Sequence, residues 1–472
     1  MRNVKLRGWR GVLSLLPLTI ITLAVNCPAF AATRTTLWNF QVDASTDGRH
    51  SVAGLIRDGK GNLYGTTSEG GAYCEAEGGF GEPGCGTVFE LSPPATKGGP
   101  WTETIIWSFG SYATDGYYPL AGLVMAKAGN LYGTTQFGGA YLAYPSFGGT
   151  VFKLTPPPTS SGSWTESIIW SFGNGTDGEM PEAGLFINSK GNLYGTTAIG
   201  GVYYHASANG GTPGGAVFEL SPPVTSGGNW TESILWSFGN ENDGSMPVAG
   251  LIVDKAGNLY GTTSEGGVYT TTVGNFVYGL GTAFKLSPPA TSGGKWTEAV
   301  LWDFGNGADG NAPLASLIMD SGGNLYGTTG NDGVYDGGTA FELSPPATSG
   351  ANWTEAILRD FGSGTDGAGP VAGLIMDSQG NLYGTTAVGG LYGSTDTGGT
   401  AFELSPPATT GDNWNESILV NFGHNSSGND PVASLLMDPA HNLYGTTKSG
   451  GTHGGNGTVF RISNLGNPTP TP

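Results

Sequence analysis

The stretch Gly257-Asn258-Leu259-Tyr260-Gly261-Thr262-Thr263 decides the fold, because the chain repeats it at nearly regular intervals. The string begins at Gly61, Gly129, Gly191, Gly257, Gly323 and Gly380, and a seventh copy begins at His441. Successive copies are 57 to 68 residues apart, which is the length of a supersecondary unit and too short for a domain. The chain is therefore built from seven units that share one architecture.

Each unit is predicted to contain four short β-strands. In the fourth unit they are expected at residues 249–254, 258–263, 282–286 and 296–304, with turns rich in glycine, asparagine and proline between them. Strict alternation in the last strand places Trp296, Trp302 and Phe304 on one face of the sheet. No segment shows a sustained apolar period of 3.6 residues, so helices should be nearly absent.

Seven units of four strands predict an all-β chain that forms a single seven-bladed β-propeller. The first three strands occur seven times, whereas a fourth strand that begins with tryptophan occurs only six times, at Trp101, Trp164, Trp230, Trp296, Trp353 and Trp414. The N-terminal stretch at residues 35–40, Thr-Thr-Leu-Trp-Asn-Phe, matches the end of that strand. We expect it to complete the last blade, which brings Trp38 close to Phe460 and hides two sheet edges. An open solenoid is the alternative, but it needs capping repeats and the sequence has none.

The two ends of the chain differ from the repeats. Residues 1–31 have a basic start, an apolar run and the small-residue pattern Ala29-Phe30-Ala31, which is typical of a secretory signal peptide. The propeller is therefore expected at residues 32–464 and a Pro/Thr-rich linker tail at residues 465–472. We predict an exported monomer, secreted, periplasmic or on the cell surface. The net charge of −19 argues against nucleic acid and anionic membranes as partners.

Two cysteines remain after the predicted cleavage. Cys74 and Cys85 lie in one glycine-rich stretch, and outside the cytoplasm a local disulfide is the favoured interpretation. A metal pair is the alternative, although the spacing does not fit a zinc knuckle.

The long repeat also resembles a known family. Gly-Leu-Ile-x-Asp-x-x-Gly-Asn-Leu-Tyr-Gly-Thr-Thr, then Gly-Gly, then Gly-Thr-Val-Phe-Glu-Leu-Ser-Pro-Pro is similar to the tandem repeat of the choice-of-anchor GloVer-containing exported bacterial proteins. This resemblance implies export, β-propeller-like repeats and often a surface anchor, but no shared activity and no catalytic residues. No sorting segment follows residues 467–472, so we expect a truncated or processed piece.

One face of the propeller should carry the function, because the loops between strands two and three and between blades emerge there and vary in length. After a Gly-Gly pair, one position of each unit is aromatic: Tyr73, Tyr141, Tyr203, Tyr269, Tyr335, Tyr392 and, in the seventh unit, His453. A ring of tyrosines around a funnel is suited to stacking on sugar rings. The alternative is that each tyrosine packs under its own loop.

An Asp-Gly turn leads into the first strand of six units. Its acidic residues are Asp47, Asp115, Asp177, Asp243, Asp309 and Asp366, and Ser427 takes the place in the seventh unit. Such carboxylates can bind calcium or act as acid and base. Six equivalent positions nevertheless favour a structural Asx turn, so we predict no metal site and name calcium as the one cofactor to test.

Residues that break the repeat are better guides to catalysis. Ring closure should make His50, Arg49, His424 and His453 neighbours, and a histidine beside a tyrosine, with Arg49 on a uronate carboxylate, is a candidate lyase site. The sequence contains no other catalytic motif. The leading prediction is a non-catalytic binding or scaffold module whose ligand is a carbohydrate or another extracellular polymer. The rival is a polysaccharide lyase or glycoside hydrolase that works on the variable-loop face.

Overall fold

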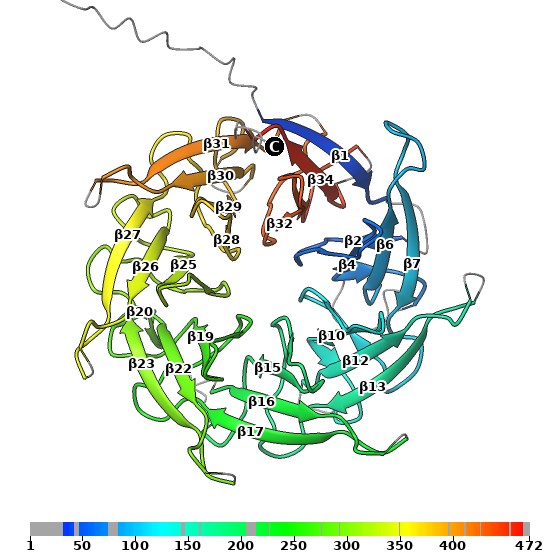
Figure 1. Cartoon of the computed structure of the whole chain (residues 1–472), viewed down its shortest axis with the longest axis horizontal. Helices are drawn as coiled ribbons and strands as arrows, with labels where there is room; N and C mark the ends of the chain where they lie inside the picture. The colour runs from blue at the N-terminus through cyan, green and yellow to red at the C-terminus, as the bar shows by residue number, and fades with distance from the viewer. Residues whose placement is uncertain are drawn as a thin grey trace, which may run out of the picture.

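A computed structural model describes most of the predicted propeller. The described residues are 32–41, 47–73, 84–142, 147–159, 162–203, 214–225, 227–274, 276–291, 293–348, 350–394, 397–409, 412–424, 426–452 and 455–465. The strands form seven four-stranded antiparallel sheets arranged in a ring (Figure 1). No helix occurs in these residues. The prediction of an all-β, seven-bladed propeller is confirmed.

Each blade runs from a two-residue strand at the centre to a seven-residue strand at the rim (Figure 1). From the centre outward, blade 1 consists of β3 (Ile56–Arg57), β4 (Leu63–Thr67), β6 (Thr87–Ser92) and β7 (Thr102–Ser108). Blade 2 consists of β9 (Val124–Met125), β10 (Leu131–Thr135), β12 (Thr150–Thr155) and β13 (Thr165–Ser171). Blade 3 consists of β14 (Phe186–Ile187), β15 (Leu193–Thr197), β16 (Ala216–Ser221) and β17 (Thr231–Ser237). Blade 4 consists of β18 (Ile252–Val253), β19 (Leu259–Thr263), β22 (Thr282–Ser287) and β23 (Thr297–Asp303). Blade 5 consists of β24 (Ile318–Met319), β25 (Leu325–Thr329), β26 (Thr339–Ser344) and β27 (Thr354–Asp360). Blade 6 consists of β28 (Ile375–Met376), β29 (Leu382–Thr386), β30 (Thr400–Ser405) and β31 (Asn415–Asn421).

Blade 7 contains both ends of the described chain. Its three inner strands are β32 (Leu436–Met437), β33 (Leu443–Thr447) and β34 (Thr458–Ser463), and the rim strand is the N-terminal β1 (Thr33–Asn39). In the register of β1 and β34, Thr36 pairs with Phe460 and Trp38 pairs with Val459. The N-terminal strand therefore closes the ring as the sequence predicted, and each blade has two neighbours.

Hydroxyl groups of the repeat motif join each blade to the next. Thr262 Oγ1 in blade 4 donates a hydrogen bond to the carbonyl oxygen of Ala315 in blade 5, at 3.2 Å. The same bond recurs at all seven junctions, and at the closing one Thr446 Oγ1 donates to Ala53 O at 3.3 Å. The glycine before this threonine is needed for packing, because a Cβ on Gly261 would lie 2.7 Å from the ring of Phe284. The Gly-Thr-Thr part of the motif is thus explained by packing within and between blades.

A β-bulge in every rim strand corrects the predicted orientation of the tryptophans. In blade 4, Phe284 pairs with Val300 while Ala283 pairs with Trp302, so Leu301 is the extra residue. The bulge reverses the alternation. Trp296 therefore packs in the core shared with blade 3, whereas Trp302 and Phe304 pack in the core shared with blade 5. The expectation that these three side chains share one face is wrong for Trp296.

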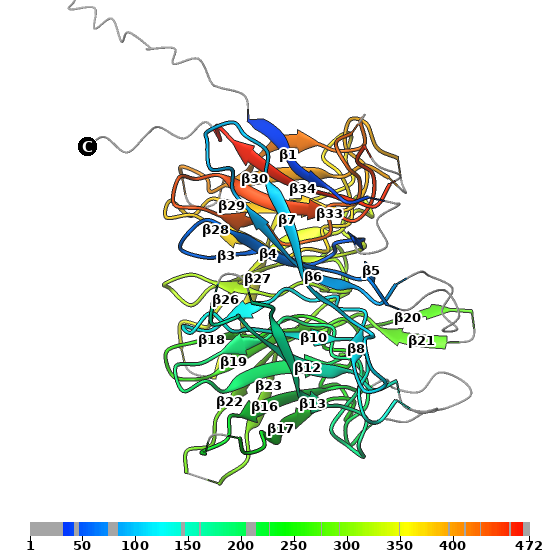
Figure 2. The same cartoon turned by 90° about the vertical axis from the view of Figure 1, so that its right-hand side faces the viewer.

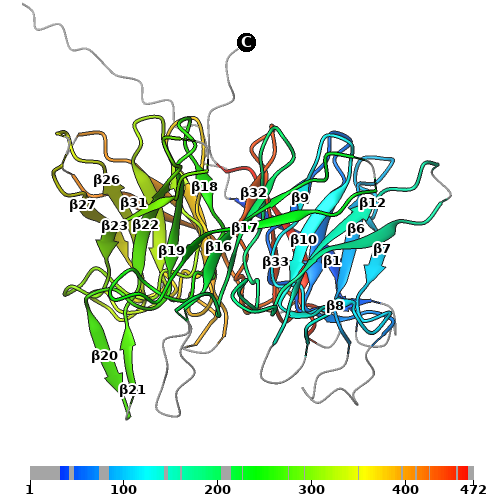
Figure 3. The same cartoon turned by 90° about the horizontal axis from the view of Figure 1, so that it is seen from below.

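The variable loops carry short strands that the sequence did not predict. β2 (Gly48–Arg49) pairs with β5 (Glu69–Gly70), and β8 (Gly116–Tyr117) pairs with β11 (Phe137–Gly138). In each pair, one strand belongs to a loop between two blades and the other to a loop between strands two and three of a blade. Both kinds of loop therefore emerge on the same face of the propeller, as expected. Blade 4 adds a projecting hairpin of β20 (Thr270–Val273) and β21 (Phe276–Gly279) on this loop face (Figures 2 and 3). Across the residues described, there is no helix long and apolar enough to span a membrane.

Candidate functional site

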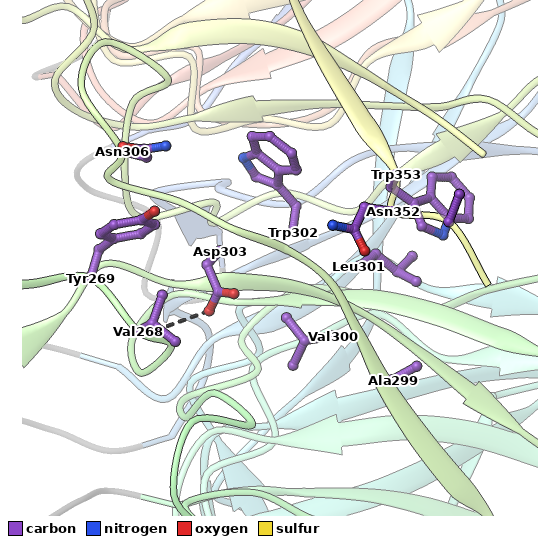
Figure 4. A pocket seen from close by; sticks show the side chains of 11 residues that line it. Val268, Tyr269, Ala299, Val300, Leu301, Trp302, Asp303, Asn306, Asn352 and Trp353 are labelled. Atoms are coloured by element: carbon purple, nitrogen blue, oxygen red, sulfur yellow. Dashed lines mark hydrogen bonds between the residues drawn. The ribbon is translucent and has the colours of Figure 1, made fainter. Parts of the chain in front are cut away.

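In blades 4, 5 and 6 the loop corner that carries the tyrosine is attached to the end of a rim strand. The backbone N–H groups of Val268 and Val334 donate to Asp303 and Asp360, each at 3.0 Å, and Leu391 N donates to Asn421 at 2.8 Å. Figure 4 shows Tyr269 beside Asp303, with the bond from Val268 drawn. The tyrosines follow these anchored residues, so they lie at the rim of the loop face. From the sequence we expected these tyrosines around a funnel. The attachment of their loops to the rim strands places them further from the centre of the ring.

The tyrosine side chains are accessible to solvent in most of the blades. Tyr73, Tyr141, Tyr203, Tyr335 and Tyr392 expose between 36 % and 53 % of their surface. Tyr269 is partly buried, in a groove with Trp302 and Trp353 (Figure 4). The corners of Tyr335 and Tyr392 are therefore anchored to rim strands while about half of each side chain stays exposed to solvent. His453, the seventh member of the predicted set, lies outside the described residues.

Two of the predicted catalytic histidines lie in different surroundings. The imidazole of His424 stacks on the ring of Tyr392, with centroids 4.6 Å apart and planes 28° apart. The imidazole of His50 instead contacts a carboxylate, with Nδ1 2.9 Å from Glu69 Oε1. The described part of the predicted histidine cluster is thus divided between one aromatic pair and one histidine–carboxylate contact.

The second of these pairs forms the most chemically distinct cluster on the loop face. Tyr118 OH donates to Glu69 Oε1 at 3.4 Å, on the same oxygen that contacts His50. Burial by itself would raise the pKa of Glu69, but the hydrogen bond and charge of His50, with a smaller contribution from Arg49, lower it overall. Glu69 is therefore held ionised beside His50. Sequence reasoning missed Glu69 because it follows the Gly-Thr-Thr motif in a position that varies between units.

The repeated aspartates are structural residues of the between-blade loops. Asp243 Oδ1 accepts hydrogen bonds from the backbone N–H groups of Gly239 and Asn240, at 3.0 and 2.9 Å, and its Oδ2 accepts one from Trp236 Nε1 at 3.2 Å. The side chain is buried, as are those of the five equivalent aspartates. No three His, Cys, Asp or Glu residues of the described ranges are grouped so as to hold a metal ion. These contacts agree with the structural interpretation rather than with acid–base chemistry.

A partly buried glutamate beside each of these aspartates was missed. The six are Glu103, Glu166, Glu232, Glu298, Glu355 and Glu416. In each, Oε1 is buried without a hydrogen-bond partner. Burial and the neighbouring Asp47 raise the pKa of Glu103 to about 9, and burial with Asp177 raises that of Glu232 to about 8. The signal was present in the sequence, because five of the six rim strands begin with Thr-Glu and the sixth with Asn-Glu.

Blade 7 replaces both members of this acid pair. Arg34 occupies the glutamate position of the rim strand, and Ser427 occupies the aspartate position. Arg34 Nη1 donates to the backbone oxygen of Ser427 at 3.1 Å. The closing blade therefore satisfies this buried site without a carboxyl pair.

Only one of the two cysteines of the predicted disulfide lies in the described residues. Cys85 is buried at the blade 1–blade 2 core, and Cys74 lies outside the described residues. The bond between them stays a prediction.

Comparison with known proteins agrees with the repeat. The family model of the Gloeobacter/Verrucomicrobia repeat matches residues 29–208 and 198–412. The chain belongs to this family. Among solved structures, the Gloeobacter/Verrucomicrobia repeat chain is similar to the holo form of the PQQ domain of pyranose dehydrogenase from Coprinopsis cinerea. The two are 12 % identical over 92 % of this chain and 98 % of that one, with a TM-score of 0.39. No curated protein matches.

Proposed function

We propose that this Gloeobacter/Verrucomicrobia repeat protein is an exported, non-catalytic module that binds an extracellular polymer, most simply a carbohydrate, at the tyrosine rim. The observation that carries the proposal is the exposure of 36 % to 53 % at five equivalent tyrosines on one face. Exposed aromatic rings on a rigid surface lose little entropy when a sugar ring stacks on them.

Repetition around the ring suits a polymer better than a small molecule. A single exposed tyrosine offers a weak contact, whereas a long chain that meets several of them gains avidity from each additional contact. The backbone anchors at Asp303, Asp360 and Asn421 keep the corners fixed relative to the blades, so the contacts are preorganised.

Replacing two of the tyrosines should weaken retention on the polymer. We expect the double variant Tyr335→Ala/Tyr392→Ala to bind any retained polysaccharide about 10-fold or more weakly, because two stacking faces are lost. The measurement is a glycan-array screen of residues 32–472 followed by titration of the hits. Val224→Ser is the matched control, because Val224 is fully exposed in the hairpin between β16 and β17 at the end of the blade away from the loop corners. Equal affinity of the double variant and the parent would contradict the proposal.

A second candidate function is carbohydrate cleavage, favoured by the contact of His50 with Glu69. A histidine held by an ionised carboxylate is a competent general base, and Tyr118 adds a hydroxyl donor. Product analysis on each retained polysaccharide separates the two functions, because the binding module releases no shorter fragments.

Export is the second part of the proposal. Strand β1 begins at Thr33, two residues after the predicted cleavage point, so cleavage after Ala31 leaves the closing strand complete. We expect exported protein to begin at Ala32, which the intact mass and N-terminal sequence of protein secreted by an expressing bacterium will check. A mature start beyond Asn39 would remove the closing strand and would contradict the assignment.

A further inference from the structure

A groove at the junction of blades 7 and 1 is lined by more basic than acidic residues, although the protein as a whole is acidic. It lies between the rim strand β1 and the hairpin that joins β6 to β7, and its volume is 780 Å³. Four cationic side chains line it, from Arg57, Lys60, Lys97 and Arg461. The single acidic lining residue is Asp438. We call this the closure groove.

The cations of the closure groove are not part of the repeated scaffold. The positions equivalent to Arg57 carry Met125, Ile187, Val253, Met319, Met376 and Met437, and those equivalent to Arg461 carry glutamate in four of the other blades and lysine in two. The corresponding groove between blades 4 and 5 has no cationic lining residue, and that between blades 2 and 3 has only Lys153 (Figure 4). Folding of a blade therefore does not require these four charges.

The charges are also available to a ligand. Arg57, Lys60 and Lys97 are exposed, and in the described ranges none of the four cations takes part in an ion pair. Arg461 Nε is buried without a hydrogen-bond partner, and its guanidinium interacts with the Tyr444 hydroxyl. Burial alone would raise the pKa of the Asp438 carboxyl, but hydrogen bonds from Asn442 and the Tyr444 hydroxyl lower it, so Asp438 stays ionised. It therefore offsets only one of the four positive charges of the groove.

Two tryptophans add an apolar surface to the same groove. Trp38 comes from β1 and Trp101 from the start of the rim strand of blade 1, and both are partly buried. Trp101 is held edge-on against Tyr444, with ring centroids 6.5 Å apart. Aromatic faces that alternate with guanidinium and ammonium groups suit a sugar ring that carries an anionic substituent.

We propose that the closure groove binds an acidic polysaccharide, through carboxylate or sulfate groups on Arg57, Lys60, Lys97 and Arg461 and through sugar faces on Trp38 and Trp101. A short run of acidic sugars fits four cations in one groove. A nucleic acid needs a basic track that continues over many phosphates, whereas these four cations are confined to one groove. The residues are separate from the tyrosine rim, so either proposal can fail without the other.

The test compares the binding of four polymers to residues 32–472 at low salt. They are polygalacturonate, which carries only carboxylates, dextran sulfate, which carries only sulfates, neutral dextran, and single-stranded DNA. We expect binding to polygalacturonate or dextran sulfate that weakens as salt is raised, and none to neutral dextran at this groove. The triple variant Arg57→Gln/Lys60→Gln/Lys97→Gln should lose about 10- to 100-fold in affinity.

The matched control is Lys127→Gln/Lys190→Gln/Lys255→Gln, which removes the same charge from the short turns of blades 2 to 4. It should bind like the parent. Equal losses in both triple variants, or equally tight binding of DNA, would show a general charge effect and would overturn the proposal. Absence of binding to both acidic polysaccharides would overturn it as well. Loss of binding in Tyr335→Ala/Tyr392→Ala with the closure-groove variant unaffected would place acidic sugars at the tyrosine rim instead.

Discussion

Raising the pH from about 5 to about 9 is expected to lower the free energy of unfolding of this propeller steeply. The six partly buried rim-strand glutamates are the cause. Burial and the nearby aspartates raise the pKa to about 9 for Glu103, to about 8 for Glu166, Glu232 and Glu355, and to about 7 for Glu298. Burial also raises the pKa of Glu416 to about 7, although Arg359, 2.8 Å away, lowers it. In the unfolded chain the same groups titrate near 4.3.

The unfolding free energy falls with rising pH because the folded protein binds more protons than the unfolded chain. Between the unfolded and folded pKa values, the folded ring keeps a proton on each glutamate that the unfolded chain has released. The stabilisation is therefore complete below about pH 4 and is lost as pH rises through 7 to 9. Within that window each such carboxyl contributes a slope of about −1.4 kcal/mol per pH unit to the free energy of unfolding.

A single substitution isolates one of these groups. Glu232→Gln has nearly the same size and shape but cannot ionise, so its unfolding free energy should fall with pH by about 1.4 kcal/mol per unit less than that of the parent between pH 5 and 8. Denaturant unfolding at a series of pH values measures this. Glu241→Gln, at an exposed loop position, is the control and should leave the slope unchanged. Parallel pH profiles for Glu232→Gln and the parent would show that Glu232 ionises normally in the ring.

Removing the N-terminal strand is expected to abolish the closed ring. A chain that begins at Asp47 lacks β1, and with it Leu37, Trp38 and the fully buried Phe40, whose ring packs on Phe89 at 5.4 Å. Loss of the Phe40 side chain alone costs about 3–5 kcal/mol. The edge of β34 then becomes free to pair with another molecule. We expect a melting temperature lower by more than about 10 °C and self-association.

Thermal unfolding and size-exclusion chromatography measure both effects. The chain that begins at Ala32, which is the expected mature protein, is the reference for both measurements, because it retains β1. A synthetic peptide of residues 32–41 should partly restore the melting temperature of the shortened chain by pairing with β34. An unchanged, monomeric truncated protein would show that blade 7 does not depend on β1.

The strands and their closure could be predicted because both rest on local, repeated patterns. Seven copies of one motif determine seven equivalent units, and a missing rim strand at one end with a matching segment at the other determines the closure. The rim bulge could not be predicted by counting alternate residues, because it adds one residue to a strand that otherwise alternates regularly. For that reason Trp296 was placed on the wrong face.

For the candidate sites, too, the sequence predicted several of the residues but not the contacts that they make. The tyrosines of the loop corners were found in the sequence because they repeat, and the structure added only that their corners are tied to rim strands. His50 and His424 were found because they break the repeat, but their contacts with Glu69 and Tyr392 depend on loops of irregular length. No pattern of spacing encodes such contacts.

By itself, the sequence determined the class of fold, the number of blades and the segment that closes the ring, because periodic apolar and glycine positions require periodic packing. Only the tertiary structure brought together residues that lie far apart in the sequence. It placed Glu232 against Asp177, and it gathered Arg57, Lys97 and Arg461 in one groove. The glutamate pKa values shift when a blade folds and buries Glu232 beside Asp177, whereas Arg461 of blade 7 joins Arg57 and Lys97 of blade 1 only when the ring closes.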